Sequence, residues 1–172
     1  MNSTGLHTNI VFFWLHEARN THEPEACLSQ WHHCNFEVNG VWYNCAEQYM
    51  MAQKALLFHD LETYEQIMAT YSPLEQKKHG RKVANYDNNI WERKRYDIVV
   101  EGNKAKFSQN PTLHDYLLST GNSILAEASP KDIVWGIGLA KDHPDASSPK
   151  RWQGKNLLGV ALMKVRDYLA NS

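Results

Sequence analysis

The segment Asn44–Phe58 reads NCAEQYMMAQKALLF, and its pattern predicts a helix that begins at a polar residue and continues in a mostly apolar run. Asn44 is a favourable N-cap residue, and Glu47 follows it by three residues. An acid at that position can bond back to the cap and interact with the positive end of the helix. A capping role therefore explains Glu47, and the alternative is a catalytic carboxylate in a pocket.

The predicted helix places Glu47 on the same face as Met50, Met51 and Lys54, which lie three, four and seven residues further along. A glutamate at the edge of a methionine-lined face suits a pocket better than open solvent. Partial burial would raise the pKa of Glu47 and suit it to proton transfer. Core packing is the alternative explanation for at least one of the two methionines.

Composition is typical of a soluble globular protein, and we expect one domain over residues 1–172. Apolar residues make up 42% of the chain and charged residues 22%, with a net charge of −1 that excludes a global attraction to nucleic acid. No apolar run approaches the length of a membrane span, and the N-terminus lacks the pattern of a signal peptide. A cytoplasmic protein without a membrane partner is therefore expected.

The three cysteines, Cys27, Cys34 and Cys45, match neither a disulfide framework nor a zinc-binding motif. His32, His33 and Cys34 lie together, but no second ligand pair follows at a zinc-like spacing. We therefore expect no metal ion and no other cofactor. Nucleophile-elbow, Walker, HExxH and EF-hand motifs are also absent from the sequence.

The remaining pattern predicts an α+β fold, mostly α, with several helices around a few short strands and a β-hairpin. Asn9–Leu15 predicts a buried strand, and Asn39-Gly40 predicts a two-residue type I′ turn between two hairpin strands. Asp132–Ala140 predicts a short strand leading into a glycine-bearing turn. Further helices are expected over Asp60–Tyr71, from Ser72-Pro73, over Asn89–Phe107, from Asn110 to Gly121 and over Asn156–Leu169.

Trp135 and Trp91 are candidates for stacking on a planar ligand. Trp135 belongs to WGIG, in which Gly136 lets the backbone turn or a ligand approach closely. Trp91 lies on a charged helix, where a tryptophan more often anchors the helix to the core. Basic residues concentrate between Lys77 and Lys106, either as solvated helix faces or as a phosphate-binding surface.

Several segments together resemble the motifs of the NADAR family, whose bacterial members include YbiA-like N-glycosidases. They occur in the family's order from about Phe12 to Tyr168: LSQWHHCNFEVNGVWYNCAEQYMMAQKA, HGRKV, AKFSQNP, LLSTGNSILAEASP, DIVWGIGLA and GKNLLGVALMKVR. The family's Ser-Asn-Phe segment is Ser29-Gln30-Trp31 here. Ile137 stands where some members carry an acid, and Asp142 is a candidate replacement for that acid.

The resemblance implies hydrolysis of the N-glycosidic bond between a ribose phosphate and a base, with early riboflavin-pathway ribosylaminopyrimidine phosphates as the expected substrates. It implies that Glu47 is catalytic, stabilising an oxocarbenium-like transition state and activating water. The expected substrate-binding residues are Trp91, Trp135 and Gly136 near the base or ribose, Ser29, Trp31 and Asn156 within family motifs, and Lys54, Arg81, Lys82 and Lys106 as phosphate ligands.

Two alternatives remain open from the sequence. The basic segment between Lys77 and Lys106 favours an ADP-ribosyl glycohydrolase that acts on modified guanine in nucleic acid. Ile137, in place of an acid, keeps open a non-catalytic module that binds ADP-ribose or another NAD derivative. The expected partner is a small phosphorylated riboside, or modified nucleic acid in the first alternative. The sequence does not fix the oligomeric state or the base that is cleaved.

Overall fold

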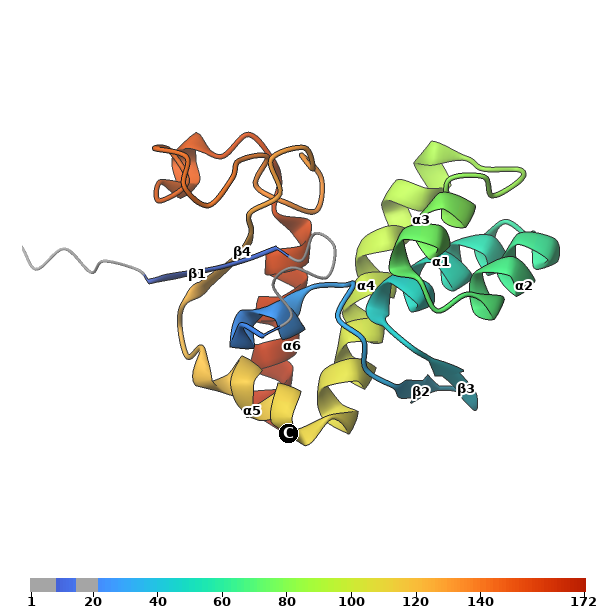
Figure 1. The fold of residues 1–172 in the computed structure, drawn as a ribbon, viewed down its shortest axis with the longest axis horizontal. Helices are drawn as coiled ribbons and strands as arrows, with labels where there is room; N and C mark the ends of the chain where they lie inside the picture. The colour runs from blue at the N-terminus through green and yellow to red at the C-terminus, as the bar shows by residue number, and fades with distance from the viewer. Residues whose placement is uncertain (1–8, 15–21) are drawn as a thin grey trace, which may run out of the picture.

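The computed structural model describes residues 9–14 and 22–172, and the predicted mostly-α α+β fold is confirmed (Figure 1). Among the described residues, no helix is both long enough and apolar enough to cross a membrane. The elements are, in chain order, β1 (Ile10–Phe13), the 3-10 helix η2 (Pro24–Leu28), β2 (Phe36–Val38), β3 (Val41–Tyr43), α1 (Ala46–Leu57), α2 (Leu61–Ala69), α3 (Pro73–Gly80), α4 (Asn88–Gln109), α5 (Pro111–Ser119), β4 (Ile124–Glu127), the 3-10 helix η3 (Pro149–Arg151) and α6 (Leu157–Ala170).

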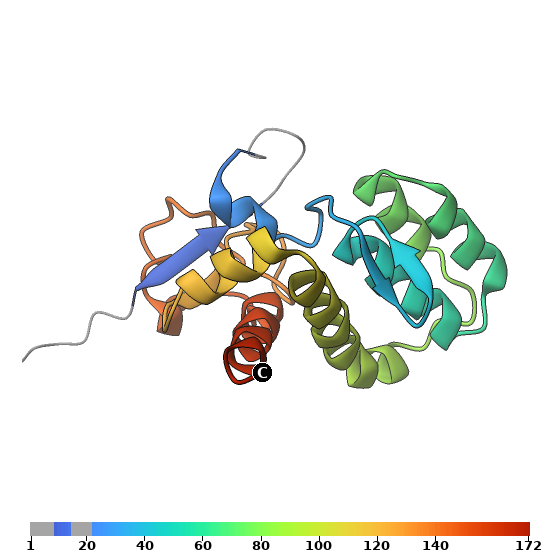
Figure 2. The ribbon, with the colours of Figure 1, turned by 90° about the horizontal axis from the view of Figure 1, so that it is seen from below.

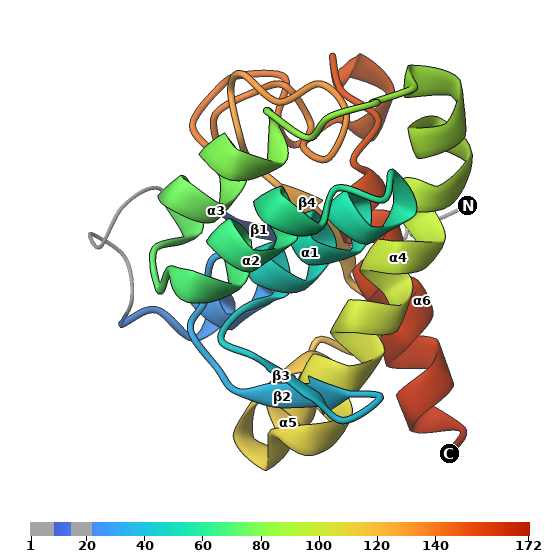
Figure 3. The same ribbon diagram turned by 90° about the vertical axis from the view of Figure 1, so that its right-hand side faces the viewer.

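Helix α4 runs through the middle of the molecule and contacts elements on both sides (Figure 2). On one side lie α1, α2, α3 and the β2–β3 hairpin, which Figure 3 shows from the outside. On the other side lie α6, α5 and the β1–β4 sheet. One apolar cluster joins both sides, because it includes Tyr49 and Met50 of α1, Val99 of α4 and Leu162 of α6.

The predicted hairpin is confirmed in place and turn type. Strands β2 and β3 pair antiparallel, with Phe36 opposite Tyr43. Asn39 and Gly40 have φ angles of 52° and 81°, as a type I′ turn requires. Because β3 ends at Tyr43, the chain enters α1 almost directly, and the hairpin determines where the first turn of α1 lies.

The N-terminal strand is confirmed over Ile10–Phe13, where it pairs in parallel with β4 and brings Phe13 opposite Glu127. The predicted burial is only partly correct, since Phe13 is buried and the other three residues are half-buried. Among the described residues, each strand of this sheet pairs on one side only. Leu15, the end of the predicted strand, lies outside the described residues.

The predicted strand over Asp132–Ala140 is wrong. The Asp132 side chain accepts hydrogen bonds from the backbone N–H groups of Val134 and Trp135, which turns the chain. The following residues bond to both β4 and the start of α6, through Ile137 N–H to Glu127 O at 2.9 Å and Leu158 N–H to Trp135 O at 3.1 Å. The segment is therefore an irregular connection between these two elements.

Gly159 lies where α6 crosses β4, and we expect Gly159→Ala to destabilise the protein. An added methyl group would overlap the Leu125 carbonyl oxygen and the Asn156 side chain. Such overpacking typically costs about 1–3 kcal/mol. Urea denaturation should show this loss, and Val160→Ala at the neighbouring exposed position should leave stability within about 0.5 kcal/mol of wild type. Equal stability of the two variants would contradict the close approach of α6 and β4.

Candidate active site

The start of α1 is capped by Cys45 and Gln48, and the predicted Asn44 cap is wrong. The Cys45 sulfur accepts a hydrogen bond from Gln48 N–H at 3.4 Å. The Gln48 side chain reaches back and accepts from the Asn44 backbone N–H at 2.8 Å. Gln48 thus occupies the reciprocal position of a capping box, which the sequence analysis gave to Glu47. Because Gln48 has this role, Glu47 is not needed to cap the helix.

The Glu47 side chain is 3% exposed, although it lies in the first turn of a helix. Its Oε1 atom is buried and has no hydrogen-bond partner among the described residues. A side-chain hydrogen bond from Trp31 reaches the carboxyl group. The Glu47 backbone N–H donates to Gln30 O at 2.9 Å, which holds the Ser29–Trp31 segment against the helix start. Glu47 is therefore an enclosed acid under Trp31.

Burial raises the pKa of Glu47 to about 7 from the ordinary value of 4.5. Lys77, the hydrogen bond from Trp31 and Arg81 act in the opposite direction, and the charge of Asp132 adds to the rise. A glutamate with this pKa can exchange a proton near neutral pH, which an exposed helix-capping glutamate cannot do efficiently.

A second buried carboxyl group, which the sequence analysis missed, comes from Glu127 at the end of β4. The residue is half-buried overall, but its Oε2 atom is enclosed and has no hydrogen-bond partner in the described part of the chain. Burial raises the pKa of Glu127 to about 8, and the charges of Asp132 and Glu47 add to this rise while Lys77 opposes it. Asp132 thus lies close enough to raise the pKa of both glutamates, and Glu47 close enough to raise that of Glu127. The acid that ends the apolar run ILAE was the sequence signal for this site.

Asn156 and Gly136, both predicted to bind substrate, hold the backbone around Glu127. Asn156 has a φ of 51°, and its amide accepts from Glu127 N–H at 3.1 Å and donates to Leu125 O at 2.8 Å. A Cβ atom on Gly136 would lie 2.9 Å from Glu127 O. These contacts fix the direction in which the Glu127 side chain leaves the strand.

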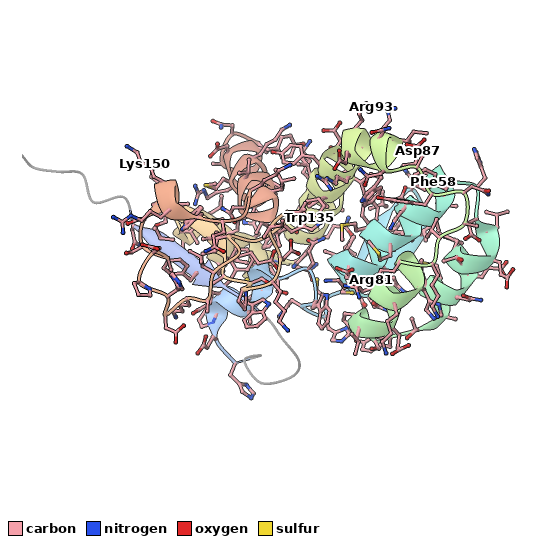
Figure 4. All side chains as sticks on the ribbon, turned by 90° about the horizontal axis from the view of Figure 1, so that it is seen from above. Phe58, Arg81, Asp87, Arg93, Trp135 and Lys150 are labelled. Carbon is pink, nitrogen blue, oxygen red and sulfur yellow. The ribbon has the colours of Figure 1, made fainter. Side chains whose placement is uncertain are left out.

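Trp135 faces the site from the loop that follows Asp132. Its backbone N–H donates to Asp132 Oδ1 at 2.8 Å, and its half-buried ring packs against the main apolar cluster. In Figure 4 Trp135 lies in the middle of the molecule, between the two groups of elements, and Arg81 lies on the side of α3. Arg81 is exposed and acts on the Glu47 carboxyl group. The structure thus brings Arg81 near Glu47 and holds Trp135 on Asp132, whose charge acts on both glutamates.

Lys54 and Trp91 lie together beside the site in a supporting arrangement. Lys54 donates to Gly80 O at 2.7 Å, and its ammonium group lies 4.5 Å from the Tyr86 ring centre and 5.4 Å from that of Trp91. Trp91 is 7% exposed and belongs to the main apolar cluster. These contacts fit the alternative in which Trp91 anchors its helix, and they fix the end of α3 next to Arg81.

Lys106 and Ser29 form a second supporting arrangement below Trp31. Lys106 is fully buried and donates to Ser29 O at 2.8 Å. The Ser29 hydroxyl oxygen accepts from Trp31 N–H at 3.1 Å. Lys106 therefore stabilises the loop that carries Trp31, and its ammonium group points to a backbone carbonyl.

Ile137 is fully buried in a second apolar cluster with Ala126, Ala128, Leu139 and Ala146. Asp142, the candidate replacement for an acid at this position, is exposed and is not among the charges that shift the pKa of Glu47 or Glu127. The charges that do act on these carboxyl groups include Asp132. In the described residues, no group of three or more His, Cys, Asp or Glu side chains is arranged to hold a metal ion.

The sequence pattern of the NADAR domain family matches residues 12–170, and the chain therefore belongs to this family. It is 46% identical over 162 residues to N-glycosidase R617 of Acanthamoeba polyphaga mimivirus, covering 91% of this chain and 94% of that protein. It is also similar to N-glycosidase YbiA of Escherichia coli (strain K12), at 31% identity over 134 residues, which are 78% of this chain and 75% of that protein.

The NMR structure of E. coli YbiA matches with a TM-score of 0.76 and 27% identity, covering 95% of this chain and 86% of that chain. A third relative is the riboflavin biosynthesis protein VVA0006 of Vibrio vulnificus (strain YJ016), 31% identical over 86% of this chain and 36% of that protein. The enzyme class predicted from the sequence thus agrees with the names of its relatives.

Replacing the buried acid should stabilise the fold at high pH. Folding raises the pKa of Glu47 from 4.5 to about 7. The buried acid therefore does not destabilise the fold below about pH 4.5, where it is protonated in both the folded and the unfolded chain. The destabilisation grows as the pH rises and is complete above about pH 7. We therefore expect Glu47→Gln to raise the free energy of unfolding by on the order of 2 kcal/mol at about pH 8 and to leave it unchanged near pH 4.5. Urea denaturation at both pH values measures this, and a pH-independent difference would contradict the burial of a titrating carboxyl group.

Proposed function

We propose that the chain is an N-glycosidase that hydrolyses the bond between a ribose phosphate and a base, with ribosylaminopyrimidine phosphates as its substrates. The observation that carries the proposal is the pair of buried carboxyl groups of Glu47 and Glu127, each with an unpartnered oxygen, beside Trp31 and Trp135. Glycoside hydrolysis typically uses two such acids in different protonation states. The names of the mimivirus and bacterial relatives support the same reaction class.

The surroundings of the two acids give them different roles at neutral pH. Lys77, Arg81 and the hydrogen bond from Trp31 favour the ionised form of Glu47. Burial, Asp132 and Glu47 favour the protonated form of Glu127, Lys77 opposes it, and neither Arg81 nor a hydrogen bond from Trp31 acts on that group. Pairs of titratable groups whose environments separate their pKa values mark the base and the acid of a reaction. Glu47 is accordingly the carboxylate of the pair, and Glu127 the neutral acid.

In the proposed reaction the Glu47 carboxylate stabilises the positive charge that develops on the ribose and takes a proton from a water molecule. The water oxygen bonds to the anomeric carbon as the bond from that carbon to the base nitrogen breaks. The electron pair of the broken bond stays on the base nitrogen, which takes the proton of Glu127. The products are the ribose phosphate and the free base, and proton exchange between the two acids and solvent restores the starting state.

Two basic residues, in α3 and at its C-cap, lie near this pair of acids. Lys77 is half-buried, its ammonium group lies 5.8 Å from the Trp31 ring centre, and it acts on both carboxyl groups. Arg81 follows four residues later on the same helix face. Together they give the site a positive potential that attracts an anionic substrate.

We expect wild-type protein to release ribose 5-phosphate from ribosylaminopyrimidine phosphates, and Glu47→Gln to reduce turnover by about 100- to 10,000-fold, because the glutamine can neither accept the proton nor balance the charge. Mass spectrometry of the products measures both rates. Glu65→Gln, at an exposed position of α2, is the matched control and should react like wild type. Turnover by Glu47→Gln at the wild-type rate would remove Glu47 from the reaction.

A second candidate substrate is ADP-ribosylated guanine in nucleic acid. Several basic side chains of α3, α4 and the connection between them are exposed, and they would attract a polyanion. They are Lys78, Arg81, Lys82, Arg93 and Lys94. In the same assay, release of ADP-ribose from modified DNA, with no cleavage of the small ribosides, would favour this substrate. Binding of ADP-ribose with no cleavage of either would favour a binding module.

The proposed roles predict a bell-shaped pH dependence of turnover. Activity should rise as Glu47 ionises around its pKa of about 7 and fall as Glu127 loses its proton around its pKa of about 8. Glu127→Gln should be slower than wild type and should lose the decline at high pH, since its side chain has no proton to lose there. A rate profile in which Glu127→Gln keeps the wild-type decline would show that Glu127 is not the acid.

A further inference from the structure

Arg95 of α4 carries a guanidinium group whose hydrogen-bonding capacity is unused. Its side chain is 11% exposed, and its nearest acid, Glu92, lies 3.8 Å away with half of its own side chain in solvent. Within the described residues the Arg95 guanidinium makes no hydrogen bond. It lies over the Trp135 ring, 6.0 Å from the ring centre. Five N–H donors thus lie in a largely enclosed place with a single weak ion pair.

Other enclosed basic side chains in the described residues each donate to at least one acceptor within the protein, although the buried Nε of Arg166 has no partner there. Arg166 in α6 donates to Thr120 Oγ1 at 2.8 Å and to Ser123 O at 2.9 Å. Lys106 and Lys54 each donate to a backbone carbonyl. Removing a charged group from water without hydrogen-bond partners is unfavourable, so such a group normally has a partner. A hydrogen-bond acceptor on a bound ligand would give Arg95 the kind of partner that the other enclosed basic side chains have within the protein.

Arg95 lies on the Trp135 side of the candidate active site, away from the carboxyl groups. Trp135 is joined to Asp132 by a backbone hydrogen bond, and Asp132 acts on both Glu47 and Glu127. Arg95 itself is not among the charges that shift the pKa of either glutamate. A ligand that spans the site from the glutamates past Trp135 would reach the Arg95 guanidinium.

A ribose phosphate carries its reacting carbon and its phosphate at opposite ends, as a site with the carboxyl pair at one end and Arg95 at the other requires. Its anomeric carbon must lie at the carboxyl pair, and its phosphate is attached at the opposite end of the sugar, on C5. Phosphate oxygens accept paired hydrogen bonds from a planar guanidinium, and stacking on an aromatic face holds that plane in a fixed orientation. Lys77 and Arg81, by contrast, act directly on the Glu47 carboxyl group, at the end of the site where the bond is cleaved.

We propose that Arg95, oriented by the Trp135 ring, binds the phosphate on C5 of the ribose and so selects phosphorylated substrates. The inference rests on the proposed function, since it places the anomeric carbon at Glu47 and Glu127. It adds a phosphate ligand outside the residues predicted from the sequence. The same contact serves a ribose 5-phosphate or the ribose-linked phosphate of an ADP-ribose group.

Isothermal titration calorimetry with ribose 5-phosphate and with ribose tests Arg95 without any turnover. We expect Arg95→Gln to bind ribose 5-phosphate at least about tenfold more weakly than wild type, because it loses charge-assisted hydrogen bonds, and to bind ribose no differently. The affinity of Arg95→Lys for ribose 5-phosphate should lie between those of wild type and Arg95→Gln, since an ammonium group keeps the charge but cannot form the paired hydrogen bonds. Arg151→Gln removes an exposed arginine of η3, to which no binding role is assigned, and should bind like wild type.

Three results would overturn the inference. One is wild-type affinity of Arg95→Gln for ribose 5-phosphate, and another is an equal loss of affinity for ribose. The third is a wild-type protein that does not distinguish the two ligands. Thermal unfolding of each variant shows whether its fold is intact, and titration with ADP-ribose shows whether a longer ligand uses the same contact.

The outcome for Arg95 can be separated from that for the proposed reaction. Phosphate-dependent binding through Arg95 with no cleavage of any riboside would contradict the proposed reaction alone. Cleavage of the phosphorylated riboside by Arg95→Gln with the KM and kcat of wild type would contradict the role of Arg95 alone.

Discussion

Two carboxyl groups buried side by side, from Glu47 and Glu127, are the constraint on which the rest of this site depends. Withdrawing a carboxylate from water is unfavourable, so burial raises both pKa values; the charge of Asp132 adds to both rises, and the charge of Glu47 adds to that of Glu127. The destabilisation persists because the surrounding fold holds each backbone firmly. Cys45 and Gln48 cap the helix that carries Glu47, and Asn156 binds the backbone of the strand that carries Glu127.

The basic residues divide into those that hold the structure and those that face the site. Lys54 and Lys106 were predicted as phosphate ligands, but each donates to a backbone carbonyl and stabilises a segment next to Glu47. Lys77 and Arg81 act on the Glu47 carboxyl group, and Lys54 also interacts with the Glu47 charge, which opposes the lowering of the Lys54 pKa by burial. Sequence position alone does not separate these roles, because lysines of both kinds occur on amphipathic helices.

Local patterns predicted most of the helices and the hairpin correctly. The Asn39-Gly40 turn and the Ser72-Pro73 helix start depend on neighbouring residues only, and both are confirmed. The features that were missed depend on contacts distant in sequence. Strand β4 exists through its pairing with β1, and Glu127 becomes a buried acid only when the chain from Asp132 onward packs against it. The Asn44 cap was assigned by residue type, whereas packing gave that position to Cys45.

Family motifs supplied what local patterns could not, because they carry the combined effect of such distant contacts. They added Trp31 and Asn156 to the candidates Glu47 and Trp135 that the local pattern had already indicated, and Trp31 and Asn156 contact the two glutamates. They gave no indication that Asn156 acts through the backbone of Glu127. They also suggested that Ile137 weakens the case for catalysis, yet that side chain lies in an apolar cluster.

The ionisation of the two glutamates is the most direct test of this account. Carbon-13 NMR of the side-chain carboxyl groups, followed through a pH titration of protein labelled at glutamate, would measure it without any substrate. The account predicts two signals that titrate near pH 7 and 8, each lost in the variant that replaces its own glutamate. Titration of every glutamate near the ordinary value of 4.5 would show that the two acids are solvated and independent, and would contradict the account.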